Sequence, residues 1–238
     1  MACIPAWFRR AFLIAACLIW AVLPVWAQKP TVNKYGLAVS SNPAAYRQQV
    51  ACDASLELID LATFIPNIVL DIRYATANNF LGEPVYTSAK AYLRRPVAQA
   101  LKAVQTELNR QGLGLKIYDA YRPYRATVYF YEKLRDTVYL APPWQGSRHN
   151  RGCTVDLTLI DLKTGRELAM PTPYDDFTKK AHVNYTRLPA PVMRNRRQLI
   201  KIMARHGFKV YAEEWWHYDY QDFKKFDLLD IRFEDLTS

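Results

Sequence analysis

Residues 147–156 of this 238-residue chain read S-R-H-N-R-G-C-T-V-D, and residues 214–217 read E-W-W-H. Together these stretches supply two imidazoles and two carboxylates, and Gly152 lets the backbone turn tightly between the first histidine and the aspartate. A catalytic zinc site needs three protein ligands, an open position for water and a separate group that accepts a proton. The assignment that follows is zinc ligation by His149, Asp156 and His217, with Glu214 as the base.

The first of these stretches leads into a predicted strand. Residues 154–162 alternate as T-V-D-L-T-L-I-D-L, so Asp156 and Thr158 share one face while the apolar residues between them enter the core. Asp156 is therefore expected to be a carboxylate held on a rigid element. His149 follows a segment that contains two prolines and a glycine, and it is expected to leave a loop and not a helix.

The second stretch raises a geometric question. On a regular strand over residues 213–220, Glu214 and His217 would face opposite sides because their separation is odd. If both serve one metal ion, Glu214 has to lie in the turn before the strand or in a bulge. Without His149 and Asp156, the same four residues would indicate an aromatic core strand.

Other periodic segments complete a fold prediction. Apolar residues at three- and four-residue spacing predict helices, and branched residues predict strands. The expected helices begin at Arg95 and stop at Gly112, and cover residues 124–135 and 195–207. The expected strands cover residues 56–65 and 68–74 (or one strand broken at Pro66), 113–121, 154–162, 208–210, 213–220 and 226–236. The class is α+β: a single domain with a central, mostly antiparallel sheet flanked by helices and the zinc site at the sheet.

The N-terminus has the pattern of a secretory signal. Two arginines precede an apolar run over residues 11–22, and Ala27 offers a small-residue exit, so cleavage after residue 27 is expected. The alternatives are an uncleaved membrane anchor, which Pro24 disfavours, and lipidation at Cys17, which the apolar residues after it disfavour. Each version exports the domain, with the periplasm as expected location and no stable membrane span after cleavage.

The remaining chain is expected to comprise an extended lead-in over residues 28–55 and one domain over residues 56–238. The net charge of +10 comes from scattered lysines and arginines without a nucleic-acid motif, so no nucleic-acid partner is expected. The positive charge is expected either to bind an acidic polymer of the cell envelope or only to keep the protein surface soluble. Cys153 is expected to be a packing residue, or half of a disulfide with Cys52, in preference to a metal ligand.

Two further polar segments are candidates for the site. Arg122 stands at a predicted strand end before Pro123, where its forked donors can hold an oxyanion or carboxylate, or form an ion pair with Asp119. The proline-rich loop over residues 171–177 carries an Asp pair that can receive a cation or serve the turn.

These motifs, in order, carry a family resemblance. R-Y-A-T-A-N-N-F, D-A-Y-R-P, S-R-H-N-R-G-C-T-V-D-L-T-L and E-W-W-H-Y resemble the zinc D-alanyl-D-alanine dipeptidases of the VanX-like group, over about residues 56–220. The resemblance implies the same three zinc ligands, Glu214 as base and Arg122 as stabiliser of the reacting centre. It also implies a substrate pocket lined by Tyr74, Ser147 and Asp175, where Asp175 or the adjacent Asp176 meets the substrate ammonium.

The resemblance implies one zinc ion per chain and hydrolysis of D-Ala-D-Ala or related peptidoglycan peptides. The segment before Ser147 looks shorter than in the vancomycin-resistance enzymes, which leaves open a D,D- or L,D-carboxypeptidase acting on longer wall peptides. Cys153 also stands where the family has a small residue. A non-catalytic, metal-stabilised wall-binding module is an alternative of another class. Glu214 argues against that module, because a structural zinc closes its fourth position with another ligand.

Overall fold

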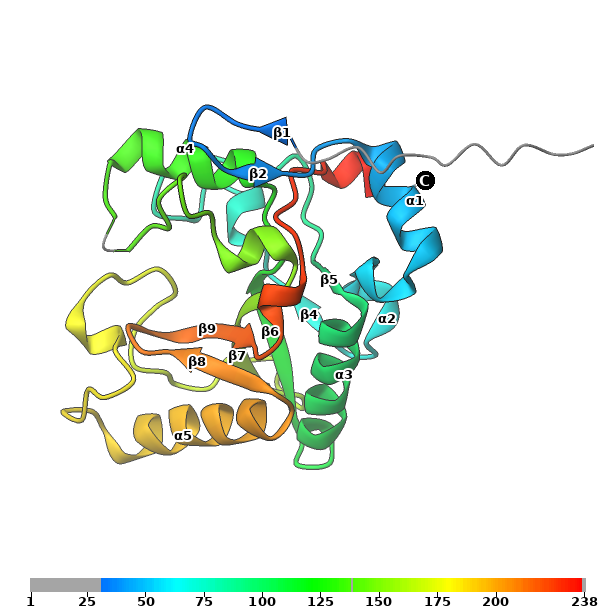
Figure 1. Cartoon of the computed structure of the whole chain (residues 1–238). Coiled ribbons are helices and arrows are strands. Elements are labelled where there is room, and N and C mark those ends of the chain that lie inside the picture. The colour runs from blue at the N-terminus through cyan, green and yellow to red at the C-terminus, as the bar shows by residue number, and fades with distance from the viewer. Residues whose placement is uncertain (1–30, 138, 237–238) are drawn as a thin grey trace, which may run out of the picture.

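The computed structural model of the protein describes residues 31–137 and 139–236 (Figure 1). The predicted signal peptide over residues 1–27 lies outside these ranges. Within them, the chain folds around one main hydrophobic core, to which strands, helices and long loops all contribute.

The centre of the molecule is a five-stranded sheet with the order β4-β6-β7-β9-β8. Its strands are β4 (Val69–Leu70), β6 (Leu113–Asp119), β7 (Thr154–Asp161), β8 (Phe208–Tyr211) and β9 (Glu214–Tyr220). β4 pairs with β6 in parallel, and the other pairs of this sheet are antiparallel. The prediction of an α+β domain with a mostly antiparallel central sheet is confirmed.

The three longer helices are α3 (Arg95–Asn109), α4 (Tyr124–Leu134) and α5 (Ala190–Arg205). α3 packs against β6 and α5 against β8, and the two helices also contact each other (Figure 1). The apolar residues at helical spacing are buried in both helices, namely Val97, Leu101, Val104 and Leu108 in α3 and Leu199, Ile202 and Met203 in α5. α5 begins ahead of the predicted residue 195 because Pro191 fits a first helical turn.

β7 is the central strand of the sheet. Asp156 and Thr158, which were expected to share one face, are as buried as the apolar residues beside them. β6 and β9 flank β7 on either side, so both of its edges are paired. Polar atoms on such a strand need partners inside the protein.

The N-terminal segment is not the extended lead-in that was expected over residues 28–55. β1 (Thr31–Val32) pairs with β2 (Ala38–Val39), and α1 (Pro43–Cys52) and the 3₁₀ turn η1 (Ala54–Leu56) follow. The Asn42 side chain accepts from two backbone amides, and Pro43 occupies the first turn, so the polar cluster is a helix cap. Because Tyr46 is the one buried residue of α1, the sequence shows no apolar period there.

Two predicted strand regions are also largely irregular. Residues 56–74 form β3 (Leu58–Asp60), the helical turn α2 (Leu61–Phe64), β4 and the 3₁₀ turn η2 (Arg73–Ala75), with β3 paired to β5 (Tyr92–Arg94). The expected terminal strand over residues 226–236 is wrong. An isolated bridge from Leu229 to Ser40 and two 3₁₀ turns, η5 (Phe223–Lys225) and η6 (Phe233–Leu236), occupy this end. Its alternating apolar residues pack on the core without a full strand partner.

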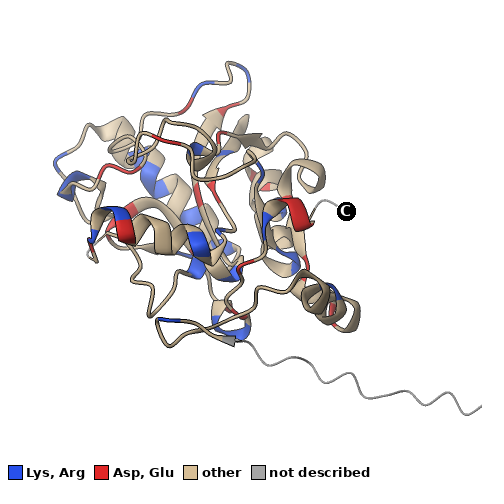
Figure 2. Cartoon of the chain, turned by 90° about the horizontal axis from the view of Figure 1, so that it is seen from above, with Lys and Arg blue, Asp and Glu red and all other residues tan. Residues whose placement is uncertain are grey.

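The basic residues are spread over the molecule. Figure 2 shows Lys and Arg on several separate helices and loops, with Asp and Glu between them. Among the helices of residues 31–137 and 139–236, none has the length and apolar character needed to cross a membrane.

Both cysteines of the described chain carry free thiols, so the expected alternative of a disulfide is wrong. Cys52 is exposed at the end of α1, and Cys153 is buried within the main core, where it acts as a packing residue. Burial raises the pKa of the Cys153 thiol to about 12, so this group stays neutral at ordinary pH.

This difference predicts selective alkylation. Iodoacetamide is expected to modify Cys52 and spare Cys153 in the folded protein, because the reactive form is the thiolate and Cys153 is both buried and neutral. Both residues are expected to react after unfolding. Peptide mapping by mass spectrometry measures the two sites separately. Equal labelling of both thiols before unfolding would contradict the assigned packing role.

Candidate metal centre

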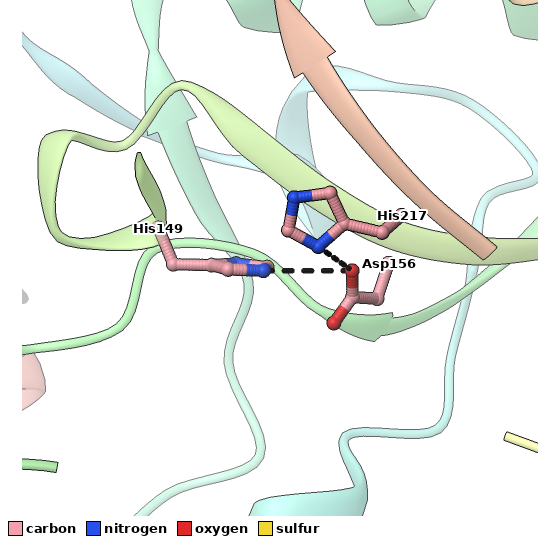
Figure 3. Close-up of side chains that lie close together, drawn as sticks. All are labelled: His149, Asp156 and His217. Atoms are coloured by element: carbon pink, nitrogen blue, oxygen red, sulfur yellow. Dashed lines mark ion pairs between the residues drawn. The ribbon is translucent and has the colours of Figure 1, made fainter. Parts of the chain in front are cut away.

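The three predicted metal ligands come from adjoining elements. His149 lies on the 3₁₀ turn η3 (Arg148–Arg151), Asp156 lies on β7, and His217 lies directly opposite Asp156 on β9. Figure 3 shows both imidazoles directed at the same carboxylate. The structure therefore brings together residues that are far apart in the sequence.

The sequence around His149 fixes its turn. Ser147 caps η3 by accepting from the His149 backbone amide, and the buried Asn150 side chain accepts from the Ser147 amide. Gly152 ends the turn in the left-handed conformation, with φ of 67°. A Cβ atom there would lie 2.6 Å from a methyl carbon of Leu58, so both conformation and space require glycine.

The ligand atoms converge on one point. One donor atom from each of His149, Asp156 and His217 lies within 4.8 Å of the other two. Asp156 Oδ1 is 3.4 Å from His149 Nε2 and 3.1 Å from His217 Nδ1. His149 Nε2 and Asp156 Oδ1 are buried without a hydrogen-bond partner. Two imidazoles and a carboxylate are ligands that suit zinc, and a bound cation would satisfy both orphaned atoms, so these residues fit a metal ion.

Neighbouring groups fix which ring nitrogen is free. His149 Nδ1 donates to the Ala120 carbonyl oxygen at 2.7 Å, which leaves Nε2 as the ligand atom. His217 Nε2 donates to Asp219 Oδ1 at 3.1 Å, which leaves Nδ1 as the ligand atom. Such outer partners orient a ligating imidazole and raise its basicity. Each histidine therefore presents a lone pair to the common point.

The aspartate is oriented in a similar way. Tyr174 donates its hydroxyl to Asp156 Oδ2 at 2.9 Å, which leaves Oδ1 free. The Tyr174 ring is buried and packs against Tyr118 and Trp216. Only one carboxylate oxygen is thus available to a metal ion from inside the cluster.

Removing an outer partner is expected to weaken metal binding. Asp219→Ala should lower affinity for zinc by roughly 10- to 100-fold, because His217 loses the acceptor that fixes its ring. Competition with a chelator of known affinity measures the change. Asp222→Ala is the matched control, since Asp222 follows β9 and its partly exposed side chain pairs with Lys225 and not with a ligand. Equal affinities in both variants would remove Asp219 from the metal centre.

Glu214 reaches the same point through a break in strand pairing. Val210 pairs with Tyr218, but the next residue of β8, Tyr211, pairs with Glu214, so extra residues of β9 bulge between these pairs. Glu214 Oε2 lies 3.4 Å from His217 Nδ1. The predicted alternative of a bulge is therefore found. Burial raises the pKa of Glu214 to about 7, and the nearby Asp156 carboxylate adds to the rise.

Of the two interpretations given for Arg122, the structure shows the ion pair with Asp119. Its Nε and Nη2 atoms donate to Asp119 Oδ2 at 3.0 and 2.8 Å, so the ion pair exists, and Arg122 also lines the pocket beside the metal ligands. The guanidinium lies over the Tyr74 ring, 5.2 Å from its centroid. Asp119 therefore fixes the direction in which Arg122 points.

Tyr74, Ser147 and Asp175, which were predicted to contact substrate, all line the pocket that contains the clustered ligands. Tyr74 donates its hydroxyl to Asp175 Oδ2 at 3.0 Å, and Ser147 lines the wall near His149. Burial raises the pKa of Asp175 well above its usual range, and the negative charges of Asp156 and Glu214 contribute. The adjacent Asp176 accepts from the Thr178 amide, which is a turn role, and it is not among the pocket-lining residues.

The pocket itself is small. Its volume is about 290 Å³, near the lower end of the range of about 300–1,000 Å³ for small-molecule sites. One wall comes from the segment between α4 and Ser147, including Tyr139, Leu140 and Pro142. The Tyr139 ring stacks on Phe177 from the proline-rich loop, with centroids 5.0 Å apart.

Asp219 and Tyr174 are not among the residues that the sequence predicts for this site. Asp219 follows His217 by two positions and so shares its strand face, which is a usable signal. Tyr174 has no such signal, because its contact with Asp156 depends on how an irregular loop folds back over β7. Asn150 is a third residue of the site that the sequence does not predict. Its side chain donates to the Arg122 carbonyl oxygen as well as holding the turn that carries His149.

Comparisons with known proteins give consistent matches. Residues 54–235 match the Peptidase M15 family, described as D-ala-D-ala dipeptidase. The chain is 34% identical over 177 residues to a D-alanyl-D-alanine dipeptidase of Escherichia coli (strain K12), covering 74% of this chain and 91% of the relative. It is 32% identical over 184 residues to a D-alanyl-D-alanine dipeptidase of Enterococcus faecium, covering 67% and 91%.

Solved structures show a weaker likeness. An LdcB LD-carboxypeptidase is 17% identical, with a TM-score of 0.42 and coverage of 71% of each chain. The vancomycin resistance D,D-dipeptidase VanXYg, in complex with a D-Ala-D-Ala phosphinate analog, is 18% identical, with a TM-score of 0.34 and coverage of 56% and 52%.

Proposed function

We propose, since this chain belongs to the D-Ala-D-Ala dipeptidase family of M15 peptidases, that it hydrolyses the amide bond of D-Ala-D-Ala in the pocket beside His149, Asp156 and His217. The observation that carries this site assignment is the convergence of buried, unpartnered ligand atoms next to the Glu214 carboxylate. A purely structural metal site has no use for such a base.

The proposed metal is zinc, held by His149 Nε2, Asp156 Oδ1 and His217 Nδ1. When bound, zinc would supply Lewis-acid polarisation of the scissile carbonyl and lower the pKa of a water molecule. Asp219, Tyr174 and the Ala120 carbonyl hold the three ligands in the orientation this requires.

Glu214 is the proposed base. Its carboxylate takes a proton from the attacking water and later gives that proton to the leaving amine. A pKa that burial raises to about 7 suits a group that must accept and release a proton near neutral pH. Arg122 is the proposed donor to the developing oxyanion, in a direction set by Asp119.

Asp175 is the proposed partner of the substrate ammonium. It lines the pocket with Tyr74, and a cation would offset the negative charge of three neighbouring carboxylates. The pocket volume of about 290 Å³ suits a dipeptide better than a longer wall peptide. The segment before Ser147 provides one wall of this pocket.

We also propose that the domain acts outside the cytoplasm, in the periplasm. Support comes from the charged, apolar and small-residue pattern of residues 1–27, which is typical of a cleaved signal peptide. In that location the basic domain would meet peptides released from the cell wall.

The test is release of free D-alanine from D-Ala-D-Ala by the purified protein, before and after chelation and zinc restoration. Release that is lost on chelation and returns with zinc is the expected result. A folded, zinc-loaded protein that releases no D-alanine would overturn the proposed activity, and an acylated tripeptide ending in D-Ala-D-Ala would then test the longer-substrate alternative.

A further inference from the structure

The charged groups of the pocket differ in how many partners of opposite charge they have. Its lining includes three carboxylates, from Asp156, Asp175 and Glu214, and two guanidinium groups, from Arg122 and Arg148. In the proposed function a zinc ion and the substrate ammonium balance the carboxylates. D-Ala-D-Ala also carries a free carboxylate, and an extended dipeptide spans roughly 7 Å, so both of its charged ends lie within a pocket of this size.

Arg122 is poorly placed for that carboxylate. Its side chain is about 10% exposed, and two of its nitrogens donate to Asp119. It also lies over the ring of Tyr74, whose hydroxyl donates to Asp175. Arg122 therefore stands at the ammonium end of the pocket, and its charge is largely balanced by Asp119.

Arg148 lines the same pocket and shares a partner, Asp219, with His217. It donates through Nη1 to Asp219 Oδ2, whereas the other oxygen of Asp219 binds His217 Nε2, the ring nitrogen that faces away from Asp156. The Arg148 guanidinium also lies over the Phe223 ring, 5.0 Å from its centroid. Among the described residues, Nε and Nη2 of Arg148 have no hydrogen-bond acceptor, and the side chain is 42% exposed.

We infer that Arg148 binds the C-terminal carboxylate of the substrate, and so makes the site selective for peptides with a free C-terminus. Asp219 and Phe223 hold the guanidinium in place at the pocket lining, and its planar set of further N–H donors matches the geometry of a carboxylate. The two charged ends of the dipeptide then contact opposite walls, Asp175 at one and Arg148 at the other. This inference rests on the proposed function.

The experiment compares D-Ala-D-Ala with its C-terminal carboxamide. The unmodified protein is expected to prefer the free carboxylate by roughly 10- to 100-fold in kcat/KM, the range for a charged hydrogen bond. Arg148→Met should reduce this preference to near unity, mainly through KM for D-Ala-D-Ala. Calorimetric binding of the two ligands to zinc-loaded Glu214→Gln, with and without Arg148→Met, should show the same loss of preference without turnover.

Arg125→Met is the matched control. Arg125 also forms an ion pair with an aspartate and is 46% exposed, but it lies on α4 and does not line the pocket. This variant should keep the full preference. Zinc content is measured in every variant, because Arg148 also touches Asp219.

The outcomes separate two ideas. If Arg148→Met keeps the preference for a free carboxylate, or lowers activity on both substrates equally together with zinc content, Arg148 only supports Asp219 and the inference fails while the proposed function stands. If the unmodified, zinc-loaded protein hydrolyses neither compound, the proposed function fails and the inference fails with it.

Discussion

Glu214→Ala is expected to lower turnover of D-Ala-D-Ala by roughly 10²- to 10⁴-fold while leaving the metal bound. The carboxylate lies 3.4 Å from His217 Nδ1 but is not one of the three clustered ligands, so its loss removes the proton acceptor and not the metal site. Steady-state kinetics and metal analysis on the same preparation measure both quantities.

Glu213→Ala provides the control for this change. Glu213 is the preceding residue, carries the same side chain and does not line the pocket, so near-parental turnover is expected. The assignment of Glu214 as base fails if Glu214→Ala turns over D-Ala-D-Ala near the parental rate. Loss of metal from this variant would instead make Glu214 a ligand.

His217→Ala is expected to lose the metal, and turnover with it. His217 supplies one of three converging ligand atoms, and two ligands alone do not form the open site that a catalytic zinc occupies. Metal content after gel filtration should fall well below one ion per chain, and activity should return poorly when zinc is added. Circular dichroism checks that the sheet around β9 remains folded.

The matched variant is His206→Ala. His206 follows α5, its Nε2 atom pairs with Glu107 at 2.9 Å, and it is not one of the clustered ligands. Full zinc occupancy in His206→Ala with loss in His217→Ala is the expected contrast. Full occupancy in both variants would remove His217 from the ligand set.

Elements with a periodic apolar face could be predicted from the sequence. The α3 helix is an example, because Val97, Leu101 and Leu108 are buried at helical spacing and Gly112 follows its end. α1 could not be found in this way, since it buries one residue and depends on the Asn42 cap. The strand prediction for the C-terminal segment was wrong because apolar residues such as Leu229 and Ile231 alternate as in a strand. They are buried in the core without regular strand pairing.

The residues of the candidate site also fall into a group that could be predicted from the sequence and a group that could not. His149, Asp156, His217 and Glu214 could be chosen from residue type and motif, and the structure gathers them. How Glu214 joins the others was open, because a bulge depends on the pairing of β8 with β9 and not on local sequence alone. The contact of Tyr174 with Asp156 depends on tertiary folding of a loop and has no sequence pattern.

The strand order has a consequence for how the protein matures. β7 carries Asp156 at the middle of the sheet, yet its partner β9, which carries His217, is made only after α5 and β8. Until then β7 exposes an unpaired edge, a form of chain prone to aggregation, and the ligand set is incomplete. The complete ligand set exists only when β9 has paired with β7, so tight binding of a metal ion at this site depends on closure of the sheet.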